Sequence, residues 1–176
     1  DGLFADDSTT GSLGPDQALD RATATGKKVA DIAEAALLEA GFEVVKAPAT
    51  RRDLGLQFQF LVTDRHLGRQ WYVDVAGAFT NARAGMRRAD VLWRTLGRAH
   101  VLSSGHAADG PHGRPRLLVL TPRLPRAGAE GDRALRAAGG YGVFDVLELF
   151  DEAAADRLRH YAETSPDRPL PGVWSE

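Results

Sequence analysis

Apolar and polar positions follow a helical period at the start of the chain and a strand period after it. Between Thr25 and Ala40, apolar residues recur three and four positions apart, which predicts a helix that stops at Gly41. Three strand-like runs then predict an antiparallel meander. These runs lie at residues 42–47, 56–64 and 70–79, with a loop at 50–55 and a hairpin turn at 65–69.

The second half of the chain alternates helical and strand patterns. This order predicts an α/β fold in which a mixed sheet is flanked by helices. The apolar run at 116–122 has the continuous character of a strand buried on both faces. We expect helices at 85–98, 129–138 and 151–162, short strands at 100–104 and 116–122, a loop at 105–115, and a strand or the lead into the last helix at 143–150.

The chain of 176 residues, 43% of them hydrophobic, is long enough for one domain with its own core. We place this domain at residues 23–163. Residues 1–22 are rich in Asp, Ser, Thr and Gly and predict an acidic linker or tail, and residues 164–176 predict a proline-rich C-terminal tail. Because the first residue is Asp1, we expect a fragment or processed piece of a longer protein.

The net charge of −2 hides an uneven distribution of basic residues. Arginines gather around a predicted helix, with Asp90 as the acidic residue among them. Two interpretations stay open: an ordinary solvated helix face, or a surface that binds phosphate, since arginine holds phosphate through paired hydrogen bonds. The clustered residues are Arg83, Arg87, Arg88, Arg94 and Arg98.

Two absences narrow the class of protein. There is no cysteine, which excludes disulfides and thiolate metal sites and fits a cytoplasmic protein. There is also no apolar run of about 18 residues, so we expect no membrane-spanning helix.

A single carboxylate, Asp74, interrupts the apolar strand predicted at 70–79. Strand alternation puts Asp74 on the face of Tyr72 and Ala76, where Gln57 of the preceding strand could face it. A buried carboxylate needs a partner, because an unpaired buried charge is costly. The partner could be a divalent cation such as Mg²⁺, held by oxygen ligands, or an arginine of the following helix.

The element order and Asp74 together resemble the PD-(D/E)XK restriction-endonuclease-like superfamily, over roughly residues 26–120. That family has an α-β-β-β-α-β core, an acidic residue near the second core strand, and (D/E)-x-K on the third. Asp74 matches the acidic position of this motif, whereas Ala76 stands where the family has lysine. The resemblance therefore implies a restriction-endonuclease-like fold with a degenerate motif.

The resemblance also implies a catalytic site. Mg²⁺ would be bound by Asp74 with Asp53 or Asp64, and Asp31 or Glu34 of the first helix would complete the site. Gln57 occupies the face-matched position on the neighbouring strand. The motif lysine would be replaced by Lys46 or by an arginine such as Arg87, Arg88 or Arg94. The implied activity is Mg²⁺-dependent hydrolysis of DNA phosphodiesters by an endodeoxyribonuclease of a bacterial restriction or antiviral defence protein.

A second hypothesis is a catalytically inactive nuclease-fold module that binds nucleic acid or a partner protein, and a third is a pure protein-interaction domain. The expected partners are DNA and other domains of a larger protein, and a homodimer would suit an enzyme that cuts both strands. Geometry separates the first two hypotheses. A second carboxylate within ~5 Å of Asp74 beside an open groove would favour hydrolysis, and burial of Asp74 against a lone arginine with no groove would favour the inactive module. Trp93 is expected in the core.

Overall fold

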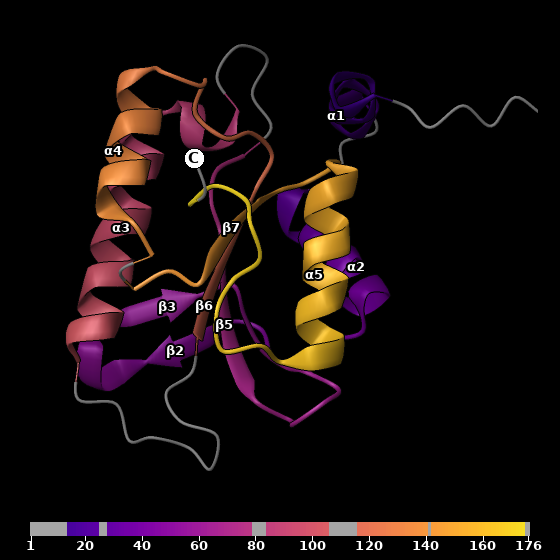
Figure 1. Ribbon diagram of the computed structural model, residues 1–176, viewed down its shortest axis with the longest axis vertical. Coiled ribbons are helices and arrows are strands. Elements are labelled where there is room, and N and C mark those ends of the chain that lie inside the picture. The colour runs from indigo at the N-terminus through magenta and orange to yellow at the C-terminus, as the bar shows by residue number, and fades with distance from the viewer. Residues whose placement is uncertain (1–13, 25–27, 79–83, 106–115, 141, 175–176) are drawn as a thin grey trace, which may run out of the picture.

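A five-stranded mixed sheet forms the centre of the molecule, with helices on both faces (Figure 1). The computed structural model describes residues 14–24, 28–78, 84–105, 116–140 and 142–174. In order across the sheet, the strands are β1 (Glu43–Lys46), β4 (Phe60–Thr63), β5 (Gln70–Val75), β6 (Arg116–Thr121) and β7 (Asp145–Glu148). The α-helices are α1 (Pro15–Ala24), α2 (Val29–Ala40), α3 (Ala89–Ser104), α4 (Glu130–Ala138) and α5 (Glu152–Thr164).

The sheet has an antiparallel half and a parallel half that share β5. Strands β1, β4 and β5 form the antiparallel meander expected from the sequence. Strands β5, β6 and β7 run parallel. Parallel neighbours need a crossover connection, and α3 and α4 supply the two crossovers. The predicted mixed sheet flanked by helices is confirmed.

Two apolar clusters fill the space on either side of the sheet. Helices α2 and α5 pack on one face, where Leu37 and Leu158 lie in the cluster that contains Trp71 and Val73 of β5. Helices α3 and α4 cover the other face, with Tyr72 of β5 in their cluster. Figure 1 shows these two helix pairs on opposite sides of the strands. Successive residues of β5 therefore point into different layers, as strand alternation requires.

A small hairpin is inserted between β1 and β4. Its strands are β2 (Ala49–Arg51) and β3 (Leu56–Phe58), joined by the 3₁₀ turn η1 (Arg52–Leu54). We expected a loop at 50–55 and one strand over 56–64, and both expectations were wrong in detail. The strand is interrupted at Gln59, whose backbone N–H donates a hydrogen bond to Val73 O. As a result, Phe58 and Phe60 are buried in different clusters instead of sharing a face.

Two other expectations also need correction. The strand predicted at 100–104 is the last part of α3, because Ala99 and Leu102 continue the buried stripe of that helix at helical spacing. The segment predicted as an acidic linker contains α1, which begins at Pro15 and pairs Asp16 with Arg123. Residues 1–13 lie outside the described ranges.

The proline-rich segment after α5 packs back onto the body of the protein. Leu170 N donates to Tyr161 Oη at 3.0 Å, and Trp174 Nε1 donates to Phe144 O at 3.1 Å. Arg136 Nη1 of α4 donates to Val173 O at 2.9 Å. These contacts make the segment part of the fold as far as residue 174.

Adjacent leucines of α2 give a matched test of this packing. Leu37 is fully buried against the sheet and Leu38 is 52% exposed. We expect Leu37→Ala to lower the free energy of unfolding by about 2–5 kcal/mol, because it leaves a cavity in the core. Leu38→Ala should change it by less than about 0.5 kcal/mol. Urea unfolding of both variants measures the difference, and equal losses would contradict the assignment of the α2 face.

Candidate functional site

Asp74 lies near the carboxyl end of β5, on the face covered by α3. Its residue exposure is only 3%. Its Oδ1 accepts a hydrogen bond from Arg98 Nη1 at 2.9 Å, and its Oδ2 lies 3.5 Å from Thr95 Oγ1. Of the two partners left open by the sequence, a cation or an arginine of the next helix, the structure contains the arginine.

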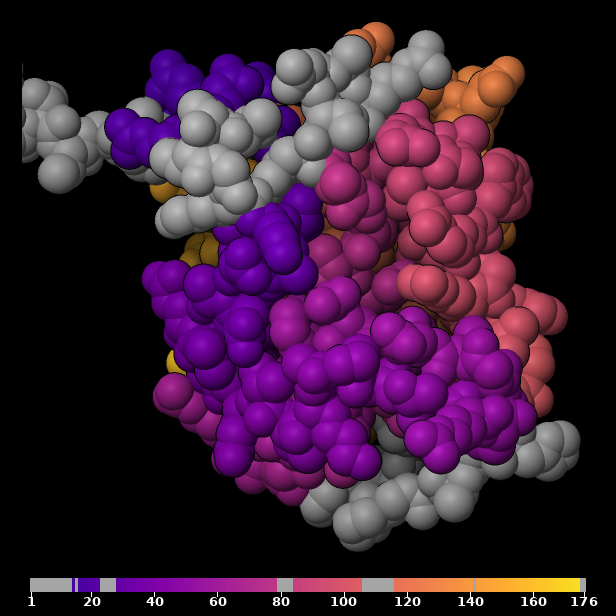
Figure 2. Space-filling view, turned by 180° about the vertical axis from the view of Figure 1, so that it is seen from behind, coloured from indigo at the N-terminus to yellow at the C-terminus, as the bar shows by residue number. Residues whose placement is uncertain are grey.

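A depression opens beside this ion pair. It has a volume of about 250 Å³ and lies between the chain that leaves β5 and the part of α3 that extends to Arg98. Figure 2 views the molecule from behind, with α3 along one side and the β2–β3 hairpin below it. The side chains that give the depression its character are Asp74, Arg88, Val91, Arg94, Thr95 and Arg98.

Close backbone packing fixes where α3 begins relative to the sheet. Gly77 and Gly85 both have positive φ, and a Cβ on Gly85 would lie 2.4 Å from Thr121 Oγ1. The Thr121 hydroxyl donates to Ala76 O at 2.9 Å and accepts from Met86 N at 3.2 Å. The ends of β5 and β6 are therefore tied to the turn η2 (Gly85–Arg87), from which α3 starts.

The arginines of the depression differ in how far carboxylates neutralise them. Arg88 donates two hydrogen bonds of 3.1 Å to Asp90, and Arg94 Nη2 lies 3.7 Å from the same carboxylate. Arg98 pairs with Asp74. Arg94 has the most exposed side chain of the three, at 56%. Three guanidinium groups thus face two carboxylates, leaving an excess of positive charge beside an accessible arginine.

Burial dominates the ionisation of Asp74. Removal from water raises the pKa of this carboxyl, and the opposing effects of Arg98, Arg94 and Thr95 do not cancel the rise. The exposed Asp90 behaves in the opposite way, because hydrogen bonds from Arg88 lower its pKa.

The carboxylates predicted to share Mg²⁺ with Asp74 do not join it. Asp64 follows β4 at the opposite end of the hairpin: Thr63 pairs with Gln70, and Asp74 is four residues further along β5, about 13 Å by strand rise. Asp64 instead accepts hydrogen bonds of 2.8 Å from Trp71 Nε1 and Leu67 N. Burial raises its pKa, but these hydrogen bonds outweigh that effect and leave the pKa lowered.

The other predicted metal ligands also lie away from Asp74. Asp53 is exposed in η1 and forms a two-point ion pair with Arg51. Asp31 and Glu34 belong to α2, on the face of the sheet opposite α3. Throughout the described ranges, no group of three or more His, Cys, Asp or Glu side chains is arranged to hold a metal ion. The described residues therefore do not fit the Mg²⁺ centre that the resemblance implied.

The predicted catalytic partners Lys46 and Gln57 also lie away from Asp74. Lys46 is exposed on β1 and pairs with Leu61, so two strand spacings of about 5 Å each separate it from β5. Gln57 is exposed in the β2–β3 hairpin and pairs with Thr50. Neither is among the residues around the depression, so the face-matched position assigned to Gln57 was wrong.

The predicted arginine cluster divides around the start of α3. Arg88, Arg94 and Arg98 line the depression at Asp74, as described above. Arg87 lies instead in a second pocket, between α3 and α4. Arg83 falls outside the described residues.

Sequence reasoning missed the second pocket and misplaced Trp93. Trp93 is 61% exposed and lines this pocket, contrary to the core position that we expected. Helical spacing could have shown this, because Val91, Thr95 and Ala99 mark the buried stripe of α3 and Trp93 falls on the other side of the helix. Arg126, also missed, follows β6 in a segment without a recognisable motif.

Comparison with known proteins does not assign this site. No protein-family model, curated protein or solved structure matches the chain. In the parts of the chain that the structure describes, no helix has both the length and the apolar character required to cross a membrane.

The raised pKa of Asp74 predicts a specific pH dependence of stability. A folded-state pKa above the unfolded value of 3.8 means that the protonated form is favoured in the native protein. The stabilising contribution is present below pH 3.8 and is lost as pH rises through the folded pKa. We therefore expect Asp74→Asn to be at least as stable as wild type at pH 7.5, and its stability to fall less between pH 4 and 7.5.

Asp90→Asn is the matched control, because the pKa of Asp90 is lowered and the sign reverses. Thermal unfolding of the three proteins across this pH range measures both effects. A marked loss of stability in Asp74→Asn at pH 7.5 alone would show that the charged form of Asp74 stabilises the fold.

Proposed function

We propose that this chain is a nucleic-acid-binding module that holds the phosphodiester backbone of DNA in the arginine-lined depression beside Asp74. One observation carries the proposal: Arg88, Arg94 and Arg98 converge on one depression in which a buried carboxylate is paired with arginine instead of being grouped with further carboxylates. Arginine is suited to phosphate because its fork of donors matches phosphate oxygens.

The order of elements supports the restriction-endonuclease-like arrangement as part of this proposal. Helix α2, strands β1, β4 and β5, helix α3 and strand β6 follow the α-β-β-β-α-β order, with the β2–β3 hairpin as an insertion. The proposed module thus has the order of core elements found in the nuclease family. The carboxylate at the motif position, Asp74, forms an ion pair with Arg98. A setting in a bacterial restriction or defence protein belongs to the same proposal and rests on the resemblance alone.

Substitution of Arg94 tests the proposed contact. We expect Arg94→Ala to weaken binding of a short DNA duplex and to reduce the slope of log affinity against log salt by about 1, as loss of one phosphate contact does. Fluorescence anisotropy at several salt concentrations gives both quantities. Arg94 is suitable because its side chain is exposed and its nearest carboxylate is 3.7 Å away.

Arg159 provides the matched control for this experiment. It is an exposed arginine of α5, paired with Asp156 at 2.8 Å, on the opposite face of the sheet. Arg159→Ala should leave affinity and slope unchanged. Equal losses of affinity in the two variants would show that DNA is attracted by the overall charge and not held in the depression, which contradicts the proposal. A wild-type protein that does not bind duplex DNA would also contradict it.

An Mg²⁺-dependent endodeoxyribonuclease is the second candidate. It is favoured by the position of Asp74, whose carboxylate lies at the depression near the carboxyl end of a parallel strand, where α/β proteins place their sites. Plasmid cleavage with Mg²⁺ or Mn²⁺ separates the candidates. The binding module predicts intact plasmid with wild type and with Asp74→Asn, whereas metal-dependent cutting that Asp74→Asn abolishes would establish the nuclease.

A further inference from the structure

A second cavity lies between the first turns of α3 and α4, on the side of α3 away from Asp74. Its volume is about 520 Å³, which is within the range of small-molecule sites. Apolar residues form most of its lining. They are Met86, Ala89, Leu92, Pro125, Ala129 and Ala134.

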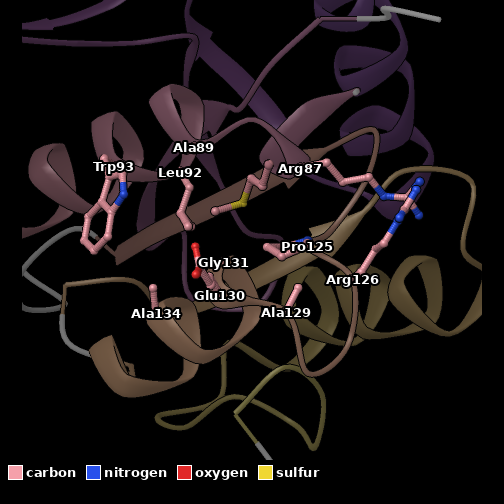
Figure 3. Close-up of a pocket in the computed structure, with 11 residues that line it drawn as sticks. Arg87, Ala89, Leu92, Trp93, Pro125, Arg126, Ala129, Glu130, Gly131 and Ala134 are labelled. Carbon is pink, nitrogen blue, oxygen red and sulfur yellow. The ribbon is translucent and has the colours of Figure 1, made fainter. Parts of the chain in front are cut away.

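Polar and aromatic groups are arranged in order across this cavity. Figure 3 shows the indole of Trp93 at one end, the guanidinium groups of Arg87 and Arg126 directed to the other end, and the carboxylate of Glu130 between them. The three groups come from separate segments: Trp93 from α3, Glu130 from the start of α4, and Arg126 from the loop after β6. The fold therefore assembles an aromatic, an acidic and a basic region in one pocket.

Carboxylates do not neutralise the two arginines of this cavity in the described part of the chain. Arg87 Nε donates to the backbone oxygen of Leu124 at 3.4 Å. In the described ranges, neither Arg87 nor Arg126 forms an ion pair with a carboxylate, in contrast to Arg88, Arg98 and Arg123. Two adjacent guanidinium groups without counter-charges attract an anion.

Trp93 is unusual among the apolar residues in its exposure to solvent. At 61% it is the most exposed of the large hydrophobic side chains that the structure describes. Its exposed indole, at the end of the cavity away from the arginines, offers a flat surface on which a base can stack. The indole of Trp93 is not part of the buried stripe of α3, which contains Val91, Leu92 and Thr95.

We propose that this cavity binds a ribonucleotide unit, with its base stacked on Trp93, a sugar hydroxyl donating to Glu130, and its phosphate held by Arg87 and Arg126. The order of base, sugar and phosphate in a nucleotide matches the order of the three regions. A carboxylate is a suitable acceptor for the 2′-hydroxyl of ribose. An acidic peptide suits the cavity less well, because Glu130 would repel it and the indole would lack a flat partner.

The ligand is either a free nucleotide or one residue of single-stranded RNA, since both contain the same chemical unit. The inference concerns a site separate from the Asp74 depression and does not depend on duplex binding there. Suitable probes are adenosine 5′-monophosphate, a single-stranded oligo(rA) and the matching oligo(dA). Isothermal titration of the full chain with each probe distinguishes the two sources and shows whether ribose is preferred.

Substitutions on the pocket surface test each contact. We expect Trp93→Ala to weaken binding about tenfold, within the range for loss of one base stack, and Trp93→Phe to retain most of the affinity. The double variant Arg87→Ala/Arg126→Ala should weaken binding of every phosphate-bearing probe by at least about tenfold. It should not change the binding of adenosine, which has no phosphate. Glu130→Ala should remove the preference for oligo(rA) over oligo(dA).

Arg159→Ala serves as the control, because Arg159 is an exposed arginine of α5 that lines neither this cavity nor the Asp74 depression. It should leave binding of all three probes unchanged. Titration of duplex DNA into Trp93→Ala reports on the Asp74 depression separately, so that failure at one site is not mistaken for failure at the other. Circular dichroism confirms folding of each variant. The inference is overturned if no probe binds wild type, if binding does not depend on Trp93 and the arginine pair, or if only an acidic peptide binds.

Discussion

The ion pair between Asp74 and Arg98 joins the strand shared by both halves of the sheet to the helix that covers it. Asp74 is nearly inaccessible to water, so its carboxylate depends on the protein for hydrogen bonds. Arg98 meets that need from α3, with Thr95 one turn earlier on the same face. This contact lies on the side of α3 that also buries Val91 and Ala99 against the sheet, and it brings Arg98 to the depression.

The start of α3 is held as firmly as its middle. Gly85 approaches Thr121 and the backbone of Arg123 so closely that a side chain at position 85 would collide with them. The side chain of Arg123 is itself buried and pairs with Glu148, which connects the ends of β6 and β7 to the same region. With its start and middle fixed, α3 separates two basic pockets, one toward Asp74 and one toward α4. The two proposed sites are thus consequences of one helix placement.

Much of the fold could be predicted from local patterns. The helix that ends at Gly41, the meander and the buried strand at 116–121 all have strong periodicity, and the structure contains them. The strand predicted at 100–104 failed because Val101 has high β-propensity, whereas Ala99 and Leu102 are held in the helical stripe by packing. The single strand predicted at 56–64 was wrong because it is interrupted at Gln59. An interruption of one residue moves Phe60 to the other face of the sheet and leaves no local signal in the sequence.

The site was less predictable than the fold, because it depends on contacts between distant segments. The sequence indicated that Asp74 needs a partner and left a metal ion and an arginine open, and only three-dimensional packing brings Arg98 to it. The spread of Asp31, Glu34, Asp53 and Asp64 over different faces and ends of the sheet also required the structure. Trp93 could have been placed by helical arithmetic, but its association with Arg126 of another segment could not.

The central claim is that Asp74 is paired with arginine instead of serving as a metal ligand. The most direct measurement is a titration of Mn²⁺ into wild type and Asp74→Asn, with and without duplex DNA, with free Mn²⁺ measured by electron paramagnetic resonance. The account predicts the same amount of bound Mn²⁺ in both proteins under both conditions. One equivalent of Mn²⁺ bound by wild type and lost in Asp74→Asn would contradict it and restore the metal-dependent nuclease.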